Sequence, residues 1–185
     1  TIVSGTKRLE AGQDIFAFYL RRWYGVDPAD GAGLFYAAPG ITSNYRVTAK
    51  GDTVTTNSTN AAFHYAGSAI PKFFGSVSST VAVKDFALSF LLNYQVGGKF
   101  YDGNYAGLLG IAYGRALHTD ALRAWKKPGD ITDIPRLDIN NTAQFNSQSD
   151  RFLIDASYLN LRNVTLTYKL PKTIVSKIGF DQAKV

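Results

Sequence analysis

The amino-acid sequence predicts an all-β fold: an antiparallel transmembrane β-barrel, of which this chain holds only a part. Three observations support that expectation. Two segments alternate apolar and polar residues over about eleven positions, whereas strands of soluble proteins average about five or six. The connections between the expected strands are alternately short and long. Charged residues make up 18% of the chain, below the roughly 25% of a typical soluble domain.

The composition excludes several classes of protein. Mean hydropathy is −0.09, and no apolar run reaches about 18 residues, so a membrane protein of this composition would have to cross with half-apolar strands. The absence of cysteine excludes disulfides and thiolate metal sites. The net charge is +6, but the basic residues are scattered rather than clustered, so we expect no nucleic-acid partner.

The N-terminal part predicts one strand and a returning strand. Apolar residues alternate over 16–21, and Trp23 and Tyr24 follow as interfacial aromatic residues would at the end of a membrane strand. The glycine- and aspartate-rich stretch 25–33 predicts a turn, and residues 34–38 predict the short returning strand.

The clearest element is a hairpin over residues 77–96. Valines share one face of its first strand, and the chain turns at Lys84–Asp85. In the second strand, large apolar residues alternate with small or polar ones such as Ser89 and Asn93, which predicts an antiparallel pair. The second strand has the length of about nine to eleven residues that a tilted membrane-spanning strand needs. The residues expected to face lipid are Phe86, Leu88, Phe90 and Leu92.

A second long strand is expected from Tyr158 to Leu170. Its apolar residues alternate with polar ones, but Arg162 would break the apolar face at one end, above the hydrocarbon. Pro171 would end the strand because proline cannot donate to a ladder. The lipid-facing residues expected here are Val164 and Leu166. A helical turn over 173–177 and a further strand beginning at 183–185 would follow.

The connections predict how the strands are oriented. Segments 25–33, 84–85 and 171–180 are short, whereas 39–75 and 97–157 are long, and loops of that length are uncommon in a compact soluble domain. Short turns at one end and long loops at the other are typical of outer-membrane barrels. We therefore expect 84–85 and 171–180 at the periplasmic end and both long segments outside the cell. About five to six strands cannot close around a lumen, so the other strands are expected outside this chain.

Four segments, in this order, resemble one family. They are Tyr24-Gly-Val-Asp-Pro-Ala-Asp-Gly31, Gly67-Ser-Ala-Ile-Pro-Lys-Phe-Phe-Gly75, Trp125-Lys-Lys-Pro-Gly-Asp-Ile-Thr-Asp-Ile-Pro-Arg136 and Asp155-Ala-Ser-Tyr-Leu-Asn-Leu-Arg-Asn-Val-Thr-Leu-Thr-Tyr-Lys-Leu-Pro171. The family is that of the SusC/RagA-like TonB-dependent transporters of Bacteroidetes outer membranes. The departures are small: Ser76 replaces a glycine of the family pattern, and Asn160 replaces an arginine.

The resemblance implies a barrel of about 22 strands with a plugged lumen. All of residues 1–185 would belong to the barrel domain, with the plug and the last strands outside this chain. It also implies a SusD-like surface lipoprotein as a lid, and energy supplied by TonB through a missing N-terminal region. The cargo would be an oligosaccharide or a peptide, both of which occur in the family.

No catalytic site, metal or cofactor is expected. The two histidines, His64 and His118, have neither metal-ligand spacing nor a nucleophile motif nearby. Asp27 and Asp30 lie as in part of a calcium loop, but the full spacing and terminal glutamate are missing, so a turn is expected. A glycoside hydrolase would need paired carboxylates facing a cleft, whereas the carboxylates here are mostly in turns.

The candidate contact site for substrate or partner is Trp125 with Asp130, Asp133 and Arg136. An exposed tryptophan could stack on a sugar or pack on a lid protein. Alternatively, Trp125 anchors a long loop onto the barrel rim, because the prolines and carboxylates of this segment suit turns. A different class, a soluble carbohydrate-binding or adhesin β-sandwich, also stays open; it would lack a continuous lipid face flanked by aromatic residues.

Overall fold

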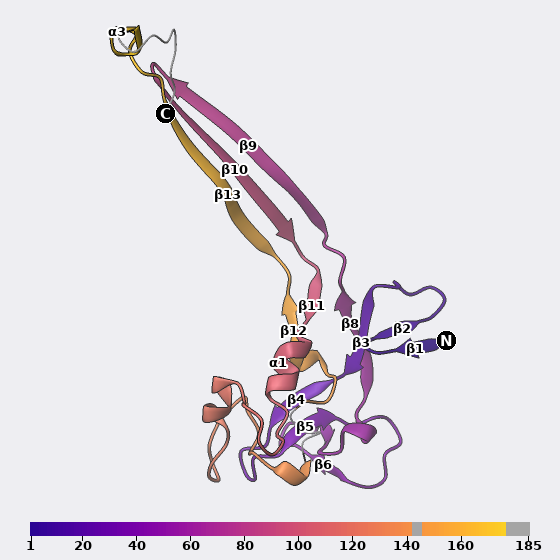
Figure 1. Cartoon of the computed structure of the whole chain (residues 1–185). Coiled ribbons are helices and arrows are strands. Elements are labelled where there is room, and N and C mark those ends of the chain that lie inside the picture. The colour runs from indigo at the N-terminus through magenta and orange to yellow at the C-terminus, as the bar shows by residue number, and fades with distance from the viewer. Residues whose placement is uncertain (142–145, 177–185) are drawn as a thin grey trace. The chain divides into compact units, whose positions relative to one another are not determined.

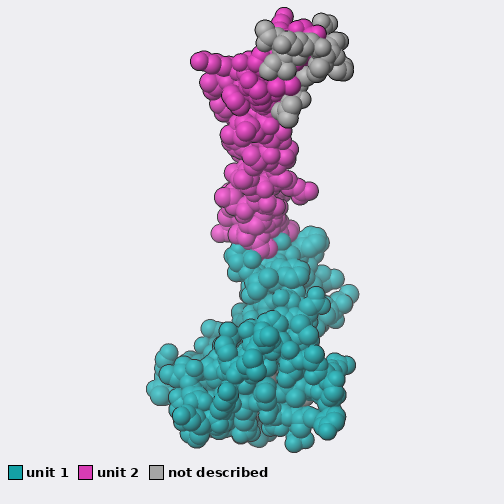
Figure 2. Space-filling view, turned by 60° about the vertical axis from the view of Figure 1, so that its left-hand side comes forward, with its two compact units in different colours: residues 1–69, 99–155 teal, residues 70–98, 156–185 magenta. Residues whose placement is uncertain are grey.

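The computed structural model describes residues 1–141 and 146–176, and these fall into two units (Figures 1 and 2). Unit 1 comprises residues 1–69 and 99–155, and unit 2 comprises the described residues of 70–98 and 156–185. Strands dominate both units. Among the described residues, no helix has the length and apolar character needed to cross a membrane.

Unit 2 is a ladder of three long antiparallel strands. They are β9 (Phe73–Val83), β10 (Phe86–Val96) and β13 (Tyr158–Tyr168), each of 11 residues, in the order β13-β10-β9. β9 and β10 are joined at Lys84–Asp85, where Lys84 takes the left-handed conformation with φ of 55°. Lys169 N donates to Asp85 O at 2.8 Å, so the end of β13 lies beside this turn. The predicted hairpin and second long strand are confirmed, with β9 beginning four positions earlier than expected, at Phe73.

The register of the ladder gathers apolar side chains on one face and small polar ones on the other. Leu88 pairs with Val81 and with Leu166. Ser89 pairs with Thr80 and Thr165 on the opposite face, and the Thr80 and Ser89 hydroxyls are 2.9 Å apart. Much of the apolar face is uncovered; Leu166, for example, is 63% exposed. The apolar row comprises Phe73, Val77, Val81, Val83, Phe86, Leu88, Phe90, Leu92, Tyr94, Val96, Leu159, Leu161, Val164, Leu166 and Tyr168.

A β-bulge in β13 corrects the expected role of Arg162. Leu91 pairs with Asn163, and the next pair is Leu92 with Leu161, so Arg162 is the extra residue between them. Strict alternation would have placed Arg162 in the apolar row. Because a bulge shifts the phase of alternation by one residue, Arg162 leaves the ladder and Leu161 returns to the row of Leu92. The apolar face therefore continues past the position where the sequence predicted its interruption.

Unit 1 is built from short strands in three sheets. The first has the order β1-β2-β3-β8, with β1 (Ile2–Ser4), β2 (Lys7–Leu9), β3 (Ala17–Arg21) and β8 (Phe63–Ser68). The second has the order β4-β5-β7-β6, with β4 (Trp23–Val26), β5 (Gly33–Tyr36), β7 (Thr53–Thr55) and β6 (Tyr45–Val47). The third pairs β11 (Lys99–Tyr101) with β12 (Leu153–Asp155).

The helices within residues 1–141 and 146–176 are short. Unit 1 contains α1 (Gly103–Leu108) and the 3-10 helices η1 (Ser58–Asn60), η2 (Thr119–Arg123), η3 (Ile139–Asn141) and η4 (Asp150–Phe152). In unit 2, α3 (Lys172–Val175) follows Pro171, where a helical turn was expected over 173–177. The strand expected at 183–185 lies outside the described residues.

Several sequence expectations for unit 1 are wrong. The long segments 39–75 and 97–157 are not plain loops, because they hold β6, β7, β8, β11 and β12. Sequence reasoning did not find these short strands, since they carry a weak alternation signal. Trp23 and Tyr24 do not cap the preceding strand; they lie in β4, where the Trp23 ring packs edge-on to Phe35 with centroids 5.0 Å apart. The turn at 25–33 and the returning strand β5 are confirmed.

Buried apolar side chains lie in several strands of unit 1. Leu20, Phe35 and Val54 are at most 1% exposed and lie in β3, β5 and β7. An apolar cluster forms beneath the segment that carries the candidate site. It comprises Ala106, Leu109, Ala124, Ile134 and Phe152, with Tyr101 and Tyr105 packed against it.

Candidate functional site

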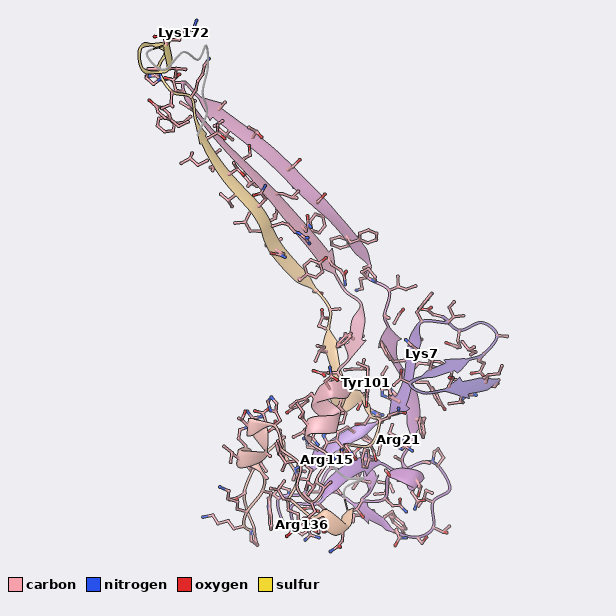
Figure 3. The ribbon with its side chains drawn as sticks, in the orientation of Figure 1. Lys7, Arg21, Tyr101, Arg115, Arg136 and Lys172 are labelled. Atoms are coloured by element: carbon pink, nitrogen blue, oxygen red, sulfur yellow. The ribbon has the colours of Figure 1, made fainter. Side chains whose placement is uncertain are left out.

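Two of the four motif segments, far apart in the sequence, pack on each other in unit 1. One is the turn at 27–32 between β4 and β5, and the other is the loop at 122–137, which ends near Arg136 (Figure 3). Trp125 Nε1 and Gly129 N both donate to Pro28 O, at 3.0 and 2.9 Å. No pattern in the sequence predicted that these segments would pair.

The 27–32 turn is shaped by its own carboxylates and by an arginine from β6. Asp27 Oδ1 accepts Ala29 N at 2.9 Å, and Asp30 Oδ1 accepts Ala32 N at 3.0 Å, as aspartates do in turns. Their other oxygens each lie 2.7 Å from the Arg46 guanidinium. The hydrogen bond from Arg46 lowers the pKa of Asp30 below its usual value. These two carboxylates therefore pair with the guanidinium of Arg46. The segment forms the turn that the sequence predicted.

The Trp125 ring packs directly against Gly31. A Cβ built on Gly31 would lie 2.4 Å from Trp125 Cδ2, a separation that real Cβ atoms do not reach. The φ of Gly31 is 72°, in the left-handed region that favours glycine. Arg136 contacts the same turn, since its backbone N donates to Gly31 O at 2.8 Å and its Nη1 donates to Asp30 O at 3.3 Å. Trp125 and Arg136 therefore both hold the turn.

The two predicted aspartates contact residues of their own loop instead. Asp130 Oδ2 accepts the backbone N–H groups of Lys126 and Lys127, at 3.1 and 3.0 Å, and so folds its own loop. Asp133 is paired with Arg123 at 2.9 Å. The four predicted site residues therefore belong to one loop but do not converge on a common point.

The outer side of the 122–137 loop carries features that sequence reasoning missed. Leu122 is 78% exposed and Ile131 is 94% exposed. A hollow of about 260 Å³ is lined by Leu122, Arg123, Ala124, Lys126, Asp130, Ile131 and Thr132. A second hollow of about 430 Å³ is lined by Ala121, Leu122, Ala124, Trp125, Lys126, Arg136 and Leu137. The signal that could have found them was the presence of isolated large apolar residues in an otherwise polar loop.

The histidines have structural partners. His64 Nε2 lies 2.9 Å from Asp150 Oδ2, and Asp150 Oδ1 accepts Trp23 N at 2.8 Å, so this pair ties η4 to β4 and β8. His118 Nδ1 accepts Asp120 N at 3.2 Å at the start of η2. Burial, together with a hydrogen bond to Asp120, raises the pKa of Tyr105 to about 12. Among the described residues, no group of three or more potential metal ligands is found.

Comparisons with known proteins agree with the motifs. No protein-family model matches the chain. TonB-dependent receptors P39 and P3 of Formosa agariphila are each 28% identical to it, over 117 and 120 residues. These alignments cover 62% and 64% of this chain and 11% of each receptor.

Solved structures give the same answer for the fold. The RagAB peptide transporter matches 91% of this chain and 18% of its own, with a TM-score of 0.67 and 25% identity. The "closed-closed" state of the RagAB peptide importer matches 100% of this chain and 20% of its own, with a TM-score of 0.69 and 23% identity.

The chain is therefore similar to TonB-dependent receptors in sequence and to the RagAB transporter in structure, which confirms the SusC/RagA-like resemblance of its motifs. Its fold is that of part of an antiparallel β-barrel. Because it spans 11% of the curated receptors, the resemblance concerns a portion of such a protein.

Proposed function

We propose that this chain is part of the barrel of a TonB-dependent importer in the bacterial outer membrane. The observation that carries the proposal is the ladder of unit 2: three strands of 11 residues with an apolar face and a small, polar face. A strand of that length crosses a membrane when tilted, and those two faces suit lipid and a watery lumen.

The apolar row of the ladder would contact outer-membrane lipid. Its members proposed for that contact are Phe86, Leu88, Phe90, Leu92, Val164 and Leu166. Ser89 and Asn93 would face the lumen, together with Thr80 and Thr165, which are paired with Ser89. The Lys84–Asp85 turn would face the periplasm.

A soluble β-sandwich would need a second layer over the apolar face. In unit 2 the described residues form a single sheet, and Val164 is 56% exposed on that face. A face this apolar is otherwise uncommon on a monomeric soluble protein. In a barrel, membrane lipid would cover this apolar face.

The wider assignment follows the relatives. The whole protein would import an oligosaccharide or a peptide, draw energy from TonB through sequence outside this chain, and work with a SusD-like lipoprotein. It would have no enzymatic activity. The segment with Trp125, Asp130, Asp133 and Arg136 would lie outside the cell as the partner-contacting region. Trp125 and Arg136 would hold this segment in place through their contacts with the 27–32 turn.

Uptake by the native bacterium tests this function. We expect that deleting the gene of the full-length parent protein abolishes import of one class of oligosaccharide or peptide, and that the full-length gene restores it. A protonophore should block the same import, because TonB transmits energy from the inner membrane. Unchanged import of both classes in the deletion strain would contradict the proposal.

A further inference from the structure

Two aromatic side chains interrupt the polar face of the unit 2 ladder at one end. β9, β10 and β13 run side by side (Figure 1), and in their register Phe74 pairs with Gln95, which in turn pairs with Tyr158. Alternate residues of a strand share a face, so this row lies opposite the apolar one. Phe73 belongs to the apolar row, where its ring packs on Tyr94 with centroids 6.2 Å apart.

The rings of Phe74 and Tyr158 are open to a ligand. Phe74 is 74% exposed and Tyr158 is 51% exposed. Within residues 1–141 and 146–176, neither ring packs on another aromatic ring or beneath a cation. The two rings therefore present apolar surface on a face that is otherwise small and polar, which is more informative than an isolated exposed aromatic residue.

Amide and hydroxyl groups fill the next row of the same face. Asn93 pairs with Ser76 on one side and with Asn160 on the other. In the row of the rings, Gln95 Nε2 donates to Ala156 O at 3.1 Å, which leaves its side-chain oxygen to accept. An amide side chain both donates and accepts hydrogen bonds, as the hydroxyl groups of a sugar do. Two rings beside three amides thus match a ligand that has apolar faces and a hydroxyl-rich edge.

The paired positions of this face carry no charged side chain. They are Phe74, Ser76, Ser78, Thr80, Ala82, Ala87, Ser89, Leu91, Asn93, Gln95, Tyr158, Asn160, Asn163, Thr165 and Thr167. The charged residues nearest to them along the chain, Lys72, Asp155 and Arg162, lie outside these pairs. Charged peptide termini would lose hydration on such a wall without gaining a partner. A sugar offers uncharged hydroxyl groups, and its C–H groups are attracted to the negative face of an aromatic ring.

We propose that Phe74 and Tyr158, with Asn93 and Asn160, form a sugar-binding subsite on the polar face of the ladder. The two rings stack on sugar rings, and the amides exchange hydrogen bonds with sugar hydroxyl groups. This inference rests on the proposed function, in which that face lines the lumen, and it narrows the cargo to an oligosaccharide. The subsite is separate from the 122–137 loop, which belongs to unit 1.

Import by the native bacterium tests the cargo class. The strain that lacks the full-length gene is offered oligosaccharides from starch, xylan and mannan, and peptides from casein. We expect import of an oligosaccharide to be lost and import of the peptides to be unchanged. Loss of peptide import would overturn the sugar subsite while the importer assignment stands. No loss of either class would contradict both.

Variants of the full-length transporter test the two rings. Phe74→Ser with Tyr158→Ser should slow uptake of that oligosaccharide roughly tenfold at low concentration, because two stacking contacts are lost, and should change uptake little at saturation. Phe74→Tyr with Tyr158→Phe keeps both rings, so uptake should stay within about twofold of the wild type. Tyr113→Ser is the matched control, since Tyr113 is 96% exposed in unit 1. Uptake is expressed per folded transporter in the outer membrane.

Two results would overturn the subsite. One is equal low-concentration uptake by the wild type and the serine double variant. The other is a loss that persists at saturation, because rings that hold another part of the protein in place would lower uptake at every cargo concentration. If the double variant does not reach the membrane, Tyr158→Ser alone should lower low-concentration uptake about threefold, and no change in that variant would equally contradict the subsite.

Discussion

The Trp125 ring occupies the space in which a side chain at Gly31 would begin. A Cβ at Gly31 would lie 2.4 Å from Cδ2 of that ring, and the indole Nε1 donates to Pro28 O in the same turn. This contact joins two motif segments, so the order of the long loop rests partly on contacts outside its own segment. Loops of this length lose considerable entropy on ordering, which this contact helps to offset.

Gly31→Ala should release the 122–137 loop. The substitution adds a steric clash, at about 1–3 kcal/mol for overpacking, to the backbone cost of a left-handed alanine, about 1–2 kcal/mol. Trypsin should then cleave the full-length protein faster after Lys126, whereas Lys127 is protected from trypsin by the proline that follows it.

Gly51→Ala is the matched control for that experiment. Gly51 has a φ of 85°, but a Cβ at this position would meet no atom within 4 Å, so only the backbone cost applies. Equal cleavage at Lys126 in both variants would show that the Trp125 contact does not hold the loop.

The tether between the 27–32 turn and Arg46 should be insensitive to pH until strongly acid conditions. Arg46 lowers the pKa of Asp30 from its ordinary 3.8, so this carboxylate adds stability above about pH 3.8 and loses it as the pH falls through the lowered pKa. Hydrogen exchange of the turn amides, corrected for intrinsic rates, should show constant protection from pH 7 to 5 and loss below pH 4. Asp30→Asn should remove that acid transition; a transition that persists in this variant would assign it to another group.

Deleting Arg162 should be tolerated, because the deletion removes the bulge and leaves Leu161 opposite Leu92. Deleting Thr165 should be damaging, because the residues between it and the bulge would slip by one and carry Val164 to the polar face. The measurement is the amount of folded full-length protein in the outer membrane. Equal losses for the two deletions would contradict the register of β13.

Arginine at position 90 should cost far more than arginine at position 89. Phe90 lies in the apolar row between Ser79 and Val164, and Phe90→Arg should destabilise the barrel by about 2–4 kcal/mol near the membrane midplane. Ser89→Arg faces the proposed lumen, and Phe90→Leu keeps an apolar side chain, so both should be tolerated. Denaturant unfolding of the full-length protein in lipid vesicles measures the difference, and equal costs at 89 and 90 would reverse or remove the lipid face.

The long strands could be predicted from the sequence because alternation over 11 residues is a strong local signal. The residues from Phe86 to Val96 reveal both faces and the turn before them. The bulge at Arg162 could not be predicted, because an arginine in an apolar row reads equally as a residue beyond the hydrocarbon. The pairing of Leu161 with Leu92 decides between these two interpretations, and that pairing depends on tertiary structure.

The candidate site was predicted only in part, for the same reason. Proline and aspartate in the Trp125–Arg136 segment indicated turns, and the bracing alternative for Trp125 agrees with its contact to Pro28. The partner of that brace, the 27–32 turn, is almost one hundred residues away in sequence, and no local pattern joins the two. Strands β6, β7 and β8 of unit 1, of three to six residues, were missed because so few positions cannot establish a period.

Cysteine labelling in intact cells tests the central claim most directly. The 185 residues contain no cysteine, so single cysteines at positions 85 and 126 of the full-length protein report on the two ends of the proposed arrangement. A membrane-impermeant maleimide should label position 126 in intact cells and position 85 only after the outer membrane is permeabilised. Labelling of 85 but not 126 in intact cells would reverse the orientation, and equal labelling of both would contradict a strand ladder that crosses the outer membrane.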